Sequence, residues 1–191
     1  EPNRVLVIGS NRWQGAATFP QLKVPAGDPN IILSVHDYEP FAFTHHTASW
    51  THIRDYRGPV HYPGATIAPD DLAAIKDPAL KAALRGHEVW DRARMLKHLR
   101  PAIETARKLH LQLYCGEFGC LPTVPRADRL AWYRDMISVF DEAGLAWANW
   151  EYKADFGIRS YNFARNTNGP IDQELIATLL SKPASPAPSQ P

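Results

Sequence analysis

Leu113-Tyr114-Cys115-Gly116-Glu117-Phe118-Gly119 is a short apolar run that ends in one carboxylate between two glycines. Buried strands of parallel sheets have such nearly continuous apolar runs. An ionised glutamate there is costly unless it is paired, and the glycines leave room for a backbone or a ligand to approach. We therefore predict a strand over residues 111–118 that presents Glu117 for chemistry. A structural ion pair with a neighbouring cation is the alternative.

The composition is that of one ordinary globular domain, with 191 residues, 45% of them apolar, and a net charge of +1. The 21 basic and 20 acidic residues are interspersed, so we expect no nucleic-acid partner. The apolar runs are far shorter than the roughly 20 residues of a spanning helix, so we expect no membrane partner. The chain begins without Met or an apolar leader, which places any targeting signal upstream.

Neither the cysteines nor the histidines have the spacing of a metal site. Cys115 and Cys120 match no zinc pattern, and an extended strand holds them beyond disulfide reach unless the chain turns after Gly119. The adjacent His45 and His46 are expected to point apart, without a third ligand at a metal spacing. We expect no metal and no cofactor, and the redox state of the cysteines stays open.

Strand and helix patterns alternate along the chain. Besides 111–118, apolar runs predict strands over 5–9, 31–36 and 146–152. Helical spacing predicts helices over 69–84, 89–109, 126–143 and 171–180, with Gly144 as the cap of the third. Residues 1–180 then form one domain. The Ser/Pro/Ala-rich segment 181–191 is expected to be a linker or a disordered terminus.

This alternation predicts an α/β fold with parallel strands, whose site lies at the carboxyl ends of the strands. Polar and aromatic residues follow each strand: Asn11 and Trp13, His36 and Tyr38, Glu117, and Trp150 with Tyr152. A doubly wound sheet is the competing arrangement. No Gly-x-Gly-x-x-Gly follows any strand, which removes the usual phosphate-binding signature of that fold.

His36 and Tyr38 are two residues apart on a strand, so their side chains leave on the same face. A tyrosine hydroxyl close to Glu117 would stabilise the ionised carboxylate and fix its orientation, as a nucleophile requires. An indole such as Trp150 at a strand end offers a flat wall on which a sugar ring can stack. The alternatives are satisfied polar residues for the first two and a core position for Trp150.

Four segments in order resemble glycoside hydrolase family 5, the clan A cellulases and endoglucanases. Residues 4–9 with Trp13 resemble the fifth strand of that family, and residues 34–45 (SVHDYEPFAFTH) with Trp50 resemble its sixth. Residues 116–119 (GEFG) resemble its seventh-strand nucleophile motif. Residues 147–153 (WANWEYK) with Phe156-Gly157 resemble its eighth-strand tryptophan motif. One departure is Asp37, which stands where the family commonly has an aromatic residue and is expected to point away from the site.

The resemblance implies the C-terminal half, strands 5 to 8, of a TIM (β/α)8 barrel that hydrolyses β-1,4-glucan with retention. It implies Glu117 as the nucleophile, with His36 and Tyr38 as its catalytic partners. Trp150 would be the floor of the sugar subsite, and Trp13, Asn11 and Trp50 would bind further substrate. The expected ligand is a β-glucan oligo- or polysaccharide, and the expected location is secreted or periplasmic.

The acid/base glutamate of the family follows an Asn at the end of the fourth strand, outside the resembling segments. Glu1 imitates that motif but stands too close to the next strand for a parallel crossover. Glu39 and Glu151 follow inward-facing residues and are expected to face away. The expected partner is therefore an N-terminal half barrel or a second copy. Without it, we expect apolar side chains on the inward faces to stay exposed to solvent, among them parts of Val5, Val7, Ile32 and Leu113.

Two other readings are open. A non-catalytic half barrel could bind glucan through Trp13, Trp50 and Trp150. An aldolase or a phosphate-handling isomerase could share the barrel fold, but the only lysine after a strand end is Lys153 and no Gly-rich phosphate loop is present.

Overall fold

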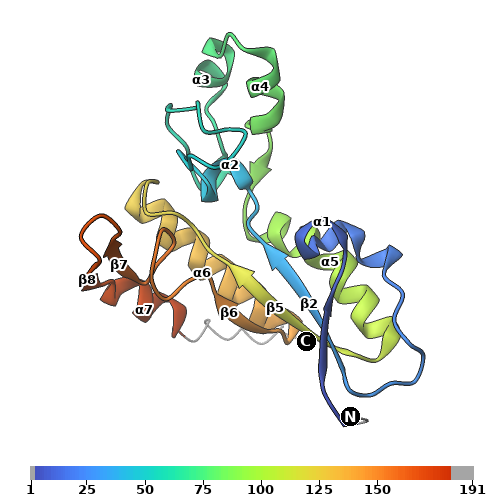
Figure 1. Ribbon diagram of the computed structural model, residues 1–191. Coiled ribbons are helices and arrows are strands. Elements are labelled where there is room, and N and C mark those ends of the chain that lie inside the picture. The colour runs from blue at the N-terminus through green and yellow to red at the C-terminus, as the bar shows by residue number, and fades with distance from the viewer. Residues whose placement is uncertain (1–2, 182–191) are drawn as a thin grey trace, which may run out of the picture.

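The computed structural model describes residues 3–181, so most of the expected tail lies outside the described residues. Its centre is a parallel four-stranded sheet in the order β1-β2-β5-β6 (Figure 1). The strands are β1 (Leu6–Gly9), β2 (Ile31–Asp37), β5 (Gln112–Phe118) and β6 (Ala146–Asn149). The predicted α/β class and all four predicted strands are confirmed. The last strand is shorter than predicted, because it ends at Asn149 rather than at residue 152.

The helices α5 (Arg92–Leu109) and α6 (Arg126–Ala143) pack against each other and cover the sheet. Their buried side chains, Met95 and Leu99 from α5 and Met136 and Phe140 from α6, form one core with the central strands. Gly144 ends α6 in the left-handed conformation, as predicted for the cap. The predicted start of α5 is wrong, because Asp91 accepts a hydrogen bond from the N–H of Arg94 and so begins the helix at Arg92.

Two other helix predictions need correction at their termini. The single helix expected over 69–84 is two helices, α3 (Pro69–Ala74) and α4 (Pro78–Leu84). Pro78 cannot donate a backbone hydrogen bond, and the Asp77 carboxylate accepts from the first N–H groups of α4. The helix expected over 171–180 is α7 (Gln173–Leu179), whose first turn is capped by Asp172.

Short elements that the sequence pattern did not predict connect these parts. They are α1 (Asn11–Gln14), the 3-10 helix η1 (Ala16–Gln21), α2 (Phe41–Thr44), the ribbon of β3 (Gly64–Ala65) with β4 (Val89–Trp90), and the hairpin of β7 (Arg159–Asn162) with β8 (Thr167–Ile171). The segment from α2 to β4 extends beyond the carboxyl end of β2, at the top of Figure 1. It therefore rises on the side of the sheet where a barrel site is expected.

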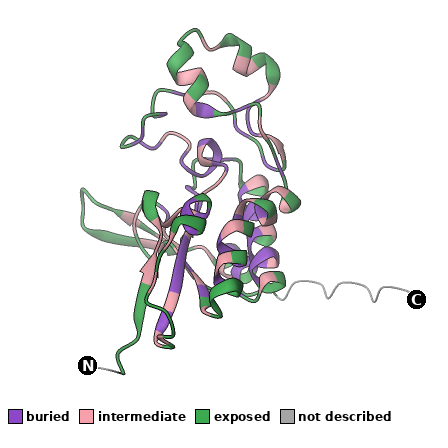
Figure 2. Ribbon diagram, turned by 90° about the vertical axis from the view of Figure 1, so that its right-hand side faces the viewer, coloured by how far each residue is buried: buried purple, intermediate pink, exposed green. Residues whose placement is uncertain are grey.

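The two outer strands of the sheet have a paired neighbour on one side only within residues 3–181. Val5, just before β1, and Val7, on β1, are 53% and 59% exposed, and Figure 2 shows the outer strand partly exposed beside the largely buried β2. Both valines are exposed to solvent, as expected, and Ile32 is half-buried. Leu113 is buried, contrary to expectation, because it lies opposite the buried Leu33 of β2 and so shares the face of the sheet that forms the main core.

Within the described part of the chain, no helix combines the length and the apolar character needed to cross a membrane. Both cysteines, Cys115 and Cys120, are buried free thiols.

Candidate active site

A one-residue bulge in β5 turns Glu117 toward His36. Val35 lies opposite Cys115, but His36 lies opposite Glu117, so Gly116 is an extra residue on β5. The pairing of β5 with β6 is shifted over the same stretch. Only glycine fits there, because a Cβ on Gly116 would lie 2.6 Å from the Ser34 hydroxyl and 3.2 Å from Nε2 of His36. The bulge thus re-aims the carboxylate at the end of the strand.

Two side chains of the β2 end converge on one oxygen of Glu117. The Tyr38 hydroxyl donates a hydrogen bond to Oε2 at 3.0 Å, and Nδ1 of His36 lies 3.4 Å from the same oxygen. These are the three residues that the sequence placed at adjacent strand ends, and the structure brings them together. All three are partly buried, so the contacts are shielded from bulk water.

The surroundings fix the protonation states of the two partners. Burial lowers the pKa of His36, although the charge of Glu117 opposes this change. Burial thus favours the neutral form of the imidazole. Burial, together with the Glu117 charge and hydrogen bond, raises the pKa of Tyr38 far above its ordinary value, so the phenol stays a proton donor.

Tyr38 is held from behind by a small aromatic cluster. Its ring meets the rings of His45 and Phe156 edge to face, at centroid distances of 5.0 and 5.7 Å. The Thr44 hydroxyl donates to the Tyr38 carbonyl. Phe156 is itself buried against Ala48 and Leu121. The orientation of the phenol toward Glu117 is therefore set by packing on one side and by hydrogen bonds on both the backbone and the side chain.

Asp37 points away from the site, as predicted from its position between two inward-facing residues. Its side chain is buried and accepts a hydrogen bond from the N–H of Glu39 at 2.9 Å. Nε2 of His98, on α5, lies 4.0 Å from the same carboxylate. Burial raises the pKa of Asp37 to about 6, with His98 opposing the change.

The other two glutamates near the strand ends have partners of their own. Glu39 accepts from the N–H of Phe41 and forms an ion pair with Arg85 at 3.3 Å, so it faces away from Glu117, as predicted. The N–H of Phe156 hydrogen-bonds the Glu151 carboxyl. Burial nevertheless raises the pKa of Glu151, and the charges of Asp155 and Glu117 add to the increase.

Two of the predicted sugar-binding tryptophans adjoin this cluster. The backbone N–H of Trp150 donates to the carbonyl of Phe118, and the residue is 43% exposed. Gly119 permits this approach, because a Cβ there would lie 2.2 Å from the Trp150 carbonyl oxygen. The ring of Trp50, 56% exposed, lies 6.4 Å from that of Phe156. As predicted, the two glycines that flank Glu117 leave room for neighbouring groups: side chains of β2 at Gly116 and the backbone of Trp150 at Gly119.

Trp13 and Asn11 lie farther out, on α1 after the first strand. Trp13 is 89% exposed, and its backbone is left-handed, like that of its neighbours Arg12 and Gln14. Gly15, which follows α1 directly, forms a bridge with His36. Within residues 3–181, no hydrogen bond or ring contact joins Trp13 or Asn11 to Glu117.

Sequence reasoning missed Thr44 and the supporting role of His45. The imidazole of His45 stacks on Phe41 at 4.1 Å, and burial lowers its pKa to about 4. His46 turns to the carbonyl of Gly58 instead, so the two adjacent histidines diverge as predicted. In the described part of the chain, no group of three or more His, Cys, Asp or Glu side chains is arranged to hold a metal ion. The dense aromatic run 41–50 was the available signal for this supporting cluster.

Comparisons with known proteins point to one family. Residues 1–156 match the profile described as Cellulase (glycosyl hydrolase family 5). Endoglucanase C of Acetivibrio thermocellus is 32% identical over 185 residues, which are 95% of this chain and 52% of that protein.

Solved structures give the same picture of the fold. A hyperthermophilic endo-β-1,4-glucanase in complex with substrate has a TM-score of 0.70 and 26% identity, over 95% of this chain and 49% of that one. Thermotoga maritima Cel5A with cellobiose has a TM-score of 0.66 and 23% identity, over 92% and 48%. The chain spans about half the length of the relatives that it matches. With its α/β sheet and the profile match over most of its length, the chain belongs to glycosyl hydrolase family 5, the cellulase family of TIM-barrel enzymes.

Proposed function

We propose that this chain supplies the nucleophile side of a retaining β-1,4-glucanase. The observation that carries the proposal is the convergence of Tyr38 and His36 on Oε2 of Glu117. Two fixed groups on one oxygen orient the carboxylate for attack by the other oxygen. The names of the relatives, endoglucanase and endo-β-1,4-glucanase, support β-glucan as the substrate class.

In the first step, the Glu117 carboxylate attacks the anomeric carbon as the bond from that carbon to the leaving oxygen breaks. An acid group gives its proton to the leaving oxygen, and the sugar stays bound to Glu117 as an ester. In the second step, the same group takes a proton from water, which attacks the anomeric carbon and releases Glu117. Tyr38 and neutral His36 hold the carboxylate through both steps.

The acid group of this mechanism must lie about 5 to 5.5 Å from the nucleophile. Glu39 is turned to Arg85, and Glu151 is held by the N–H of Phe156. We therefore assign the acid to a segment that completes the barrel. The exposed edge at Val5 and Val7, and the match to about half of each relative, support this assignment.

The exposed indoles give the proposed substrate path. Trp150 would form the floor of the subsite next to the cleaved bond, and Trp50, Trp13 and Asn11 would contact more distant sugars. A polymeric substrate also favours a secreted or periplasmic enzyme. The same indoles favour one alternative function, a half barrel that binds glucan without cleaving it.

The test compares residues 1–191 alone with the same residues in a completed barrel, by release of reducing ends from soluble β-glucan. We expect only the completed barrel to hydrolyse glucan. Within that barrel, Glu117→Gln should abolish hydrolysis, and Glu151→Gln should retain it. A monomer of residues 1–191 that cleaves glucan would overturn the assignment of the acid. A completed barrel that binds glucan but does not cleave it would favour the alternative.

A further inference from the structure

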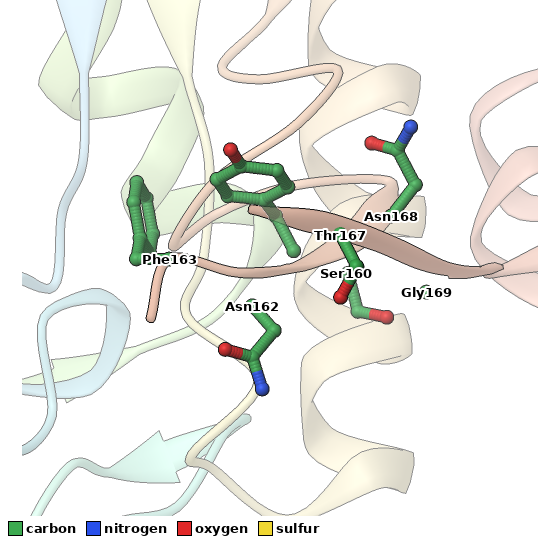
Figure 3. Close-up of a pocket in the computed structure, with 7 residues that line it drawn as sticks. Ser160, Asn162, Phe163, Thr167, Asn168 and Gly169 are labelled. Atoms are coloured by element: carbon green, nitrogen blue, oxygen red, sulfur yellow. The ribbon is translucent and has the colours of Figure 1, made fainter. Parts of the chain in front are cut away.

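The β7–β8 hairpin carries aromatic and amide groups that the mechanism above does not use. Tyr161 and Phe163 lie on one face of it, edge to face, with ring centroids 4.8 Å apart. Asn168 lies opposite Tyr161 in the ladder and so shares that face. Figure 3 shows Phe163 and Asn168 on one side of the hairpin and Asn162 on the other. The Phe163 ring is 62% exposed, although it touches a neighbouring ring.

Tyr161 is fixed in place, which makes this face a rigid one. The ammonium of Lys153 lies 4.4 Å from the centre of the Tyr161 ring, a cation–π contact. The Tyr161 hydroxyl donates to the side-chain oxygen of Asn166, across the turn of the hairpin. Phe163 therefore packs against a ring that is held on two sides, and Tyr161 has little side-chain freedom left to lose when a ligand binds.

The hairpin is joined directly to the loop that carries Trp150. The N–H of Ile158 donates to the carbonyl of Glu151, and that of Arg159 donates to the carbonyl of Tyr152. Lys153 forms a further bridge with Arg159. Exposed aromatic residues follow this path from Trp150 through Tyr152, which is 61% exposed, to the hairpin. The backbone of the hairpin is thus bonded to the loop that carries Trp150, one of the residues beside the candidate active site.

A shallow hollow of about 460 Å³ lies along the hairpin and takes in residues of both of its faces (Figure 3). Asn162 and Thr167, which pair with each other, belong to the opposite face. On the face of Tyr161 and Phe163, the lining combines flat aromatic rings with the side-chain amide of Asn168. A pyranose ring has the matching chemistry, with C–H groups on its face and hydroxyls at its edge.

We propose that the β7–β8 hairpin is a distal sugar-binding platform for a β-glucan chain whose cleaved bond lies at Glu117. A pyranose ring stacks on Phe163, and the amide of Asn168 hydrogen-bonds its hydroxyls. The platform deepens the proposed function and rests on it for the choice of ligand. It favours long glucan chains over short ones, because only a long chain reaches both Trp150 and the hairpin.

The test measures binding of cellohexaose and cellotriose by calorimetry, using the completed barrel in the Glu117→Gln background. We expect Phe163→Ala to weaken cellohexaose binding about fivefold to tenfold and to leave cellotriose binding unchanged. Phe163→Tyr should restore the binding of cellohexaose. Val89→Ala is the matched control, because Val89 is also 62% exposed but lies on β4, and it should change neither ligand.

Equal binding of cellohexaose by the Glu117→Gln parent with and without Phe163→Ala would overturn the proposal, as would an equal loss of affinity for both ligands. Trp150→Ala serves as the reference for the proposed function, and it should weaken both ligands. Hydrolysis of glucan by Glu117→Gln would show that the nucleophile assignment is wrong. If Phe163→Ala then weakens the binding of cellohexaose but not that of cellotriose, the proposed platform is still supported.

Discussion

The centre of the sheet and its outer edge differ in how far this chain completes them. At the centre, β2 and β5 are paired on both sides, and their ends bring His36, Tyr38 and Glu117 together. At the edge, β1 leaves apolar side chains exposed, among them Leu6 and Val7. A nucleophile needs a rigid scaffold, and the central pair provides one. The comparison suggests that the chain organises half of the chemistry and relies on further chain for the rest.

The largest effect is expected from the central carboxylate. Glu117→Gln keeps the shape of the side chain and removes the attacking charge, so kcat of a completed barrel on an aryl β-cellobioside should fall by about a thousandfold or more. Glu104→Gln, an exposed position on α5, is the matched control and should keep the parent rate. Turnover by Glu117→Gln within tenfold of the parent would remove Glu117 from the nucleophile role.

The edge should govern association rather than chemistry. Burying each exposed valine is worth roughly 1.5 to 3 kcal/mol, and an open strand edge pairs readily with another chain. Residues 1–191 alone should therefore elute as a dimer or a larger species in size-exclusion chromatography with light scattering.

A substitution at the edge sharpens this prediction. Val7→Lys should shift the distribution toward monomer, because a charge on an edge strand opposes pairing. Val89→Lys, equally exposed but on β4, should leave the distribution unchanged. A monomeric parent chain would contradict the assignment of β1 as an edge that needs a partner.

A smaller effect is expected from the residue that orients the carboxylate. Tyr38→Phe removes the 3.0 Å hydrogen bond to Oε2 and keeps the ring in its aromatic cluster. We expect kcat to fall by about ten- to a hundredfold with little change in KM, because the hydroxyl acts on Glu117 rather than on the sugar. An unchanged kcat would argue against a shared site for Tyr38 and Glu117.

The smallest effect concerns pH and the cluster behind Tyr38. Burial lowers the pKa of His45 to about 4 in the folded protein, against about 6.5 when unfolded. Between these values the unfolded chain binds the extra proton, so stability falls as the pH drops from about 6.5 to about 4. His45→Phe should lose this slope, and the wild-type melting temperature should drop a few degrees more than that of the variant between pH 7 and pH 5.

The raised pKa of Asp37 acts in the opposite direction, but it is present in both proteins and cancels in the comparison. Parallel melting curves of His45→Phe and the wild type across this range would show that His45 is not held neutral.

The strands and the cluster around Glu117 could be predicted from sequence, because an apolar run followed by an isolated polar residue is a local signal. The bulge at Gly116 could not, because it depends on the register between β2 and β5. The split between α3 and α4 does have a local signal, because Asp77-Pro78 is a typical start of a new helix. The strands β7 and β8 consist mostly of polar residues, so no apolar pattern marks the hairpin in the sequence.

The most direct test of the central claim is to trap the glycosyl–enzyme ester. A completed barrel is incubated with a 2-deoxy-2-fluoro β-cellobioside that carries a good leaving group, and the digested protein is examined by mass spectrometry. If Glu117 is the nucleophile, one fluorocellobiosyl group is added to the peptide that contains Glu117, and none is added in Glu117→Gln. A label on another carboxylate, in a protein that still cleaves glucan, would contradict it.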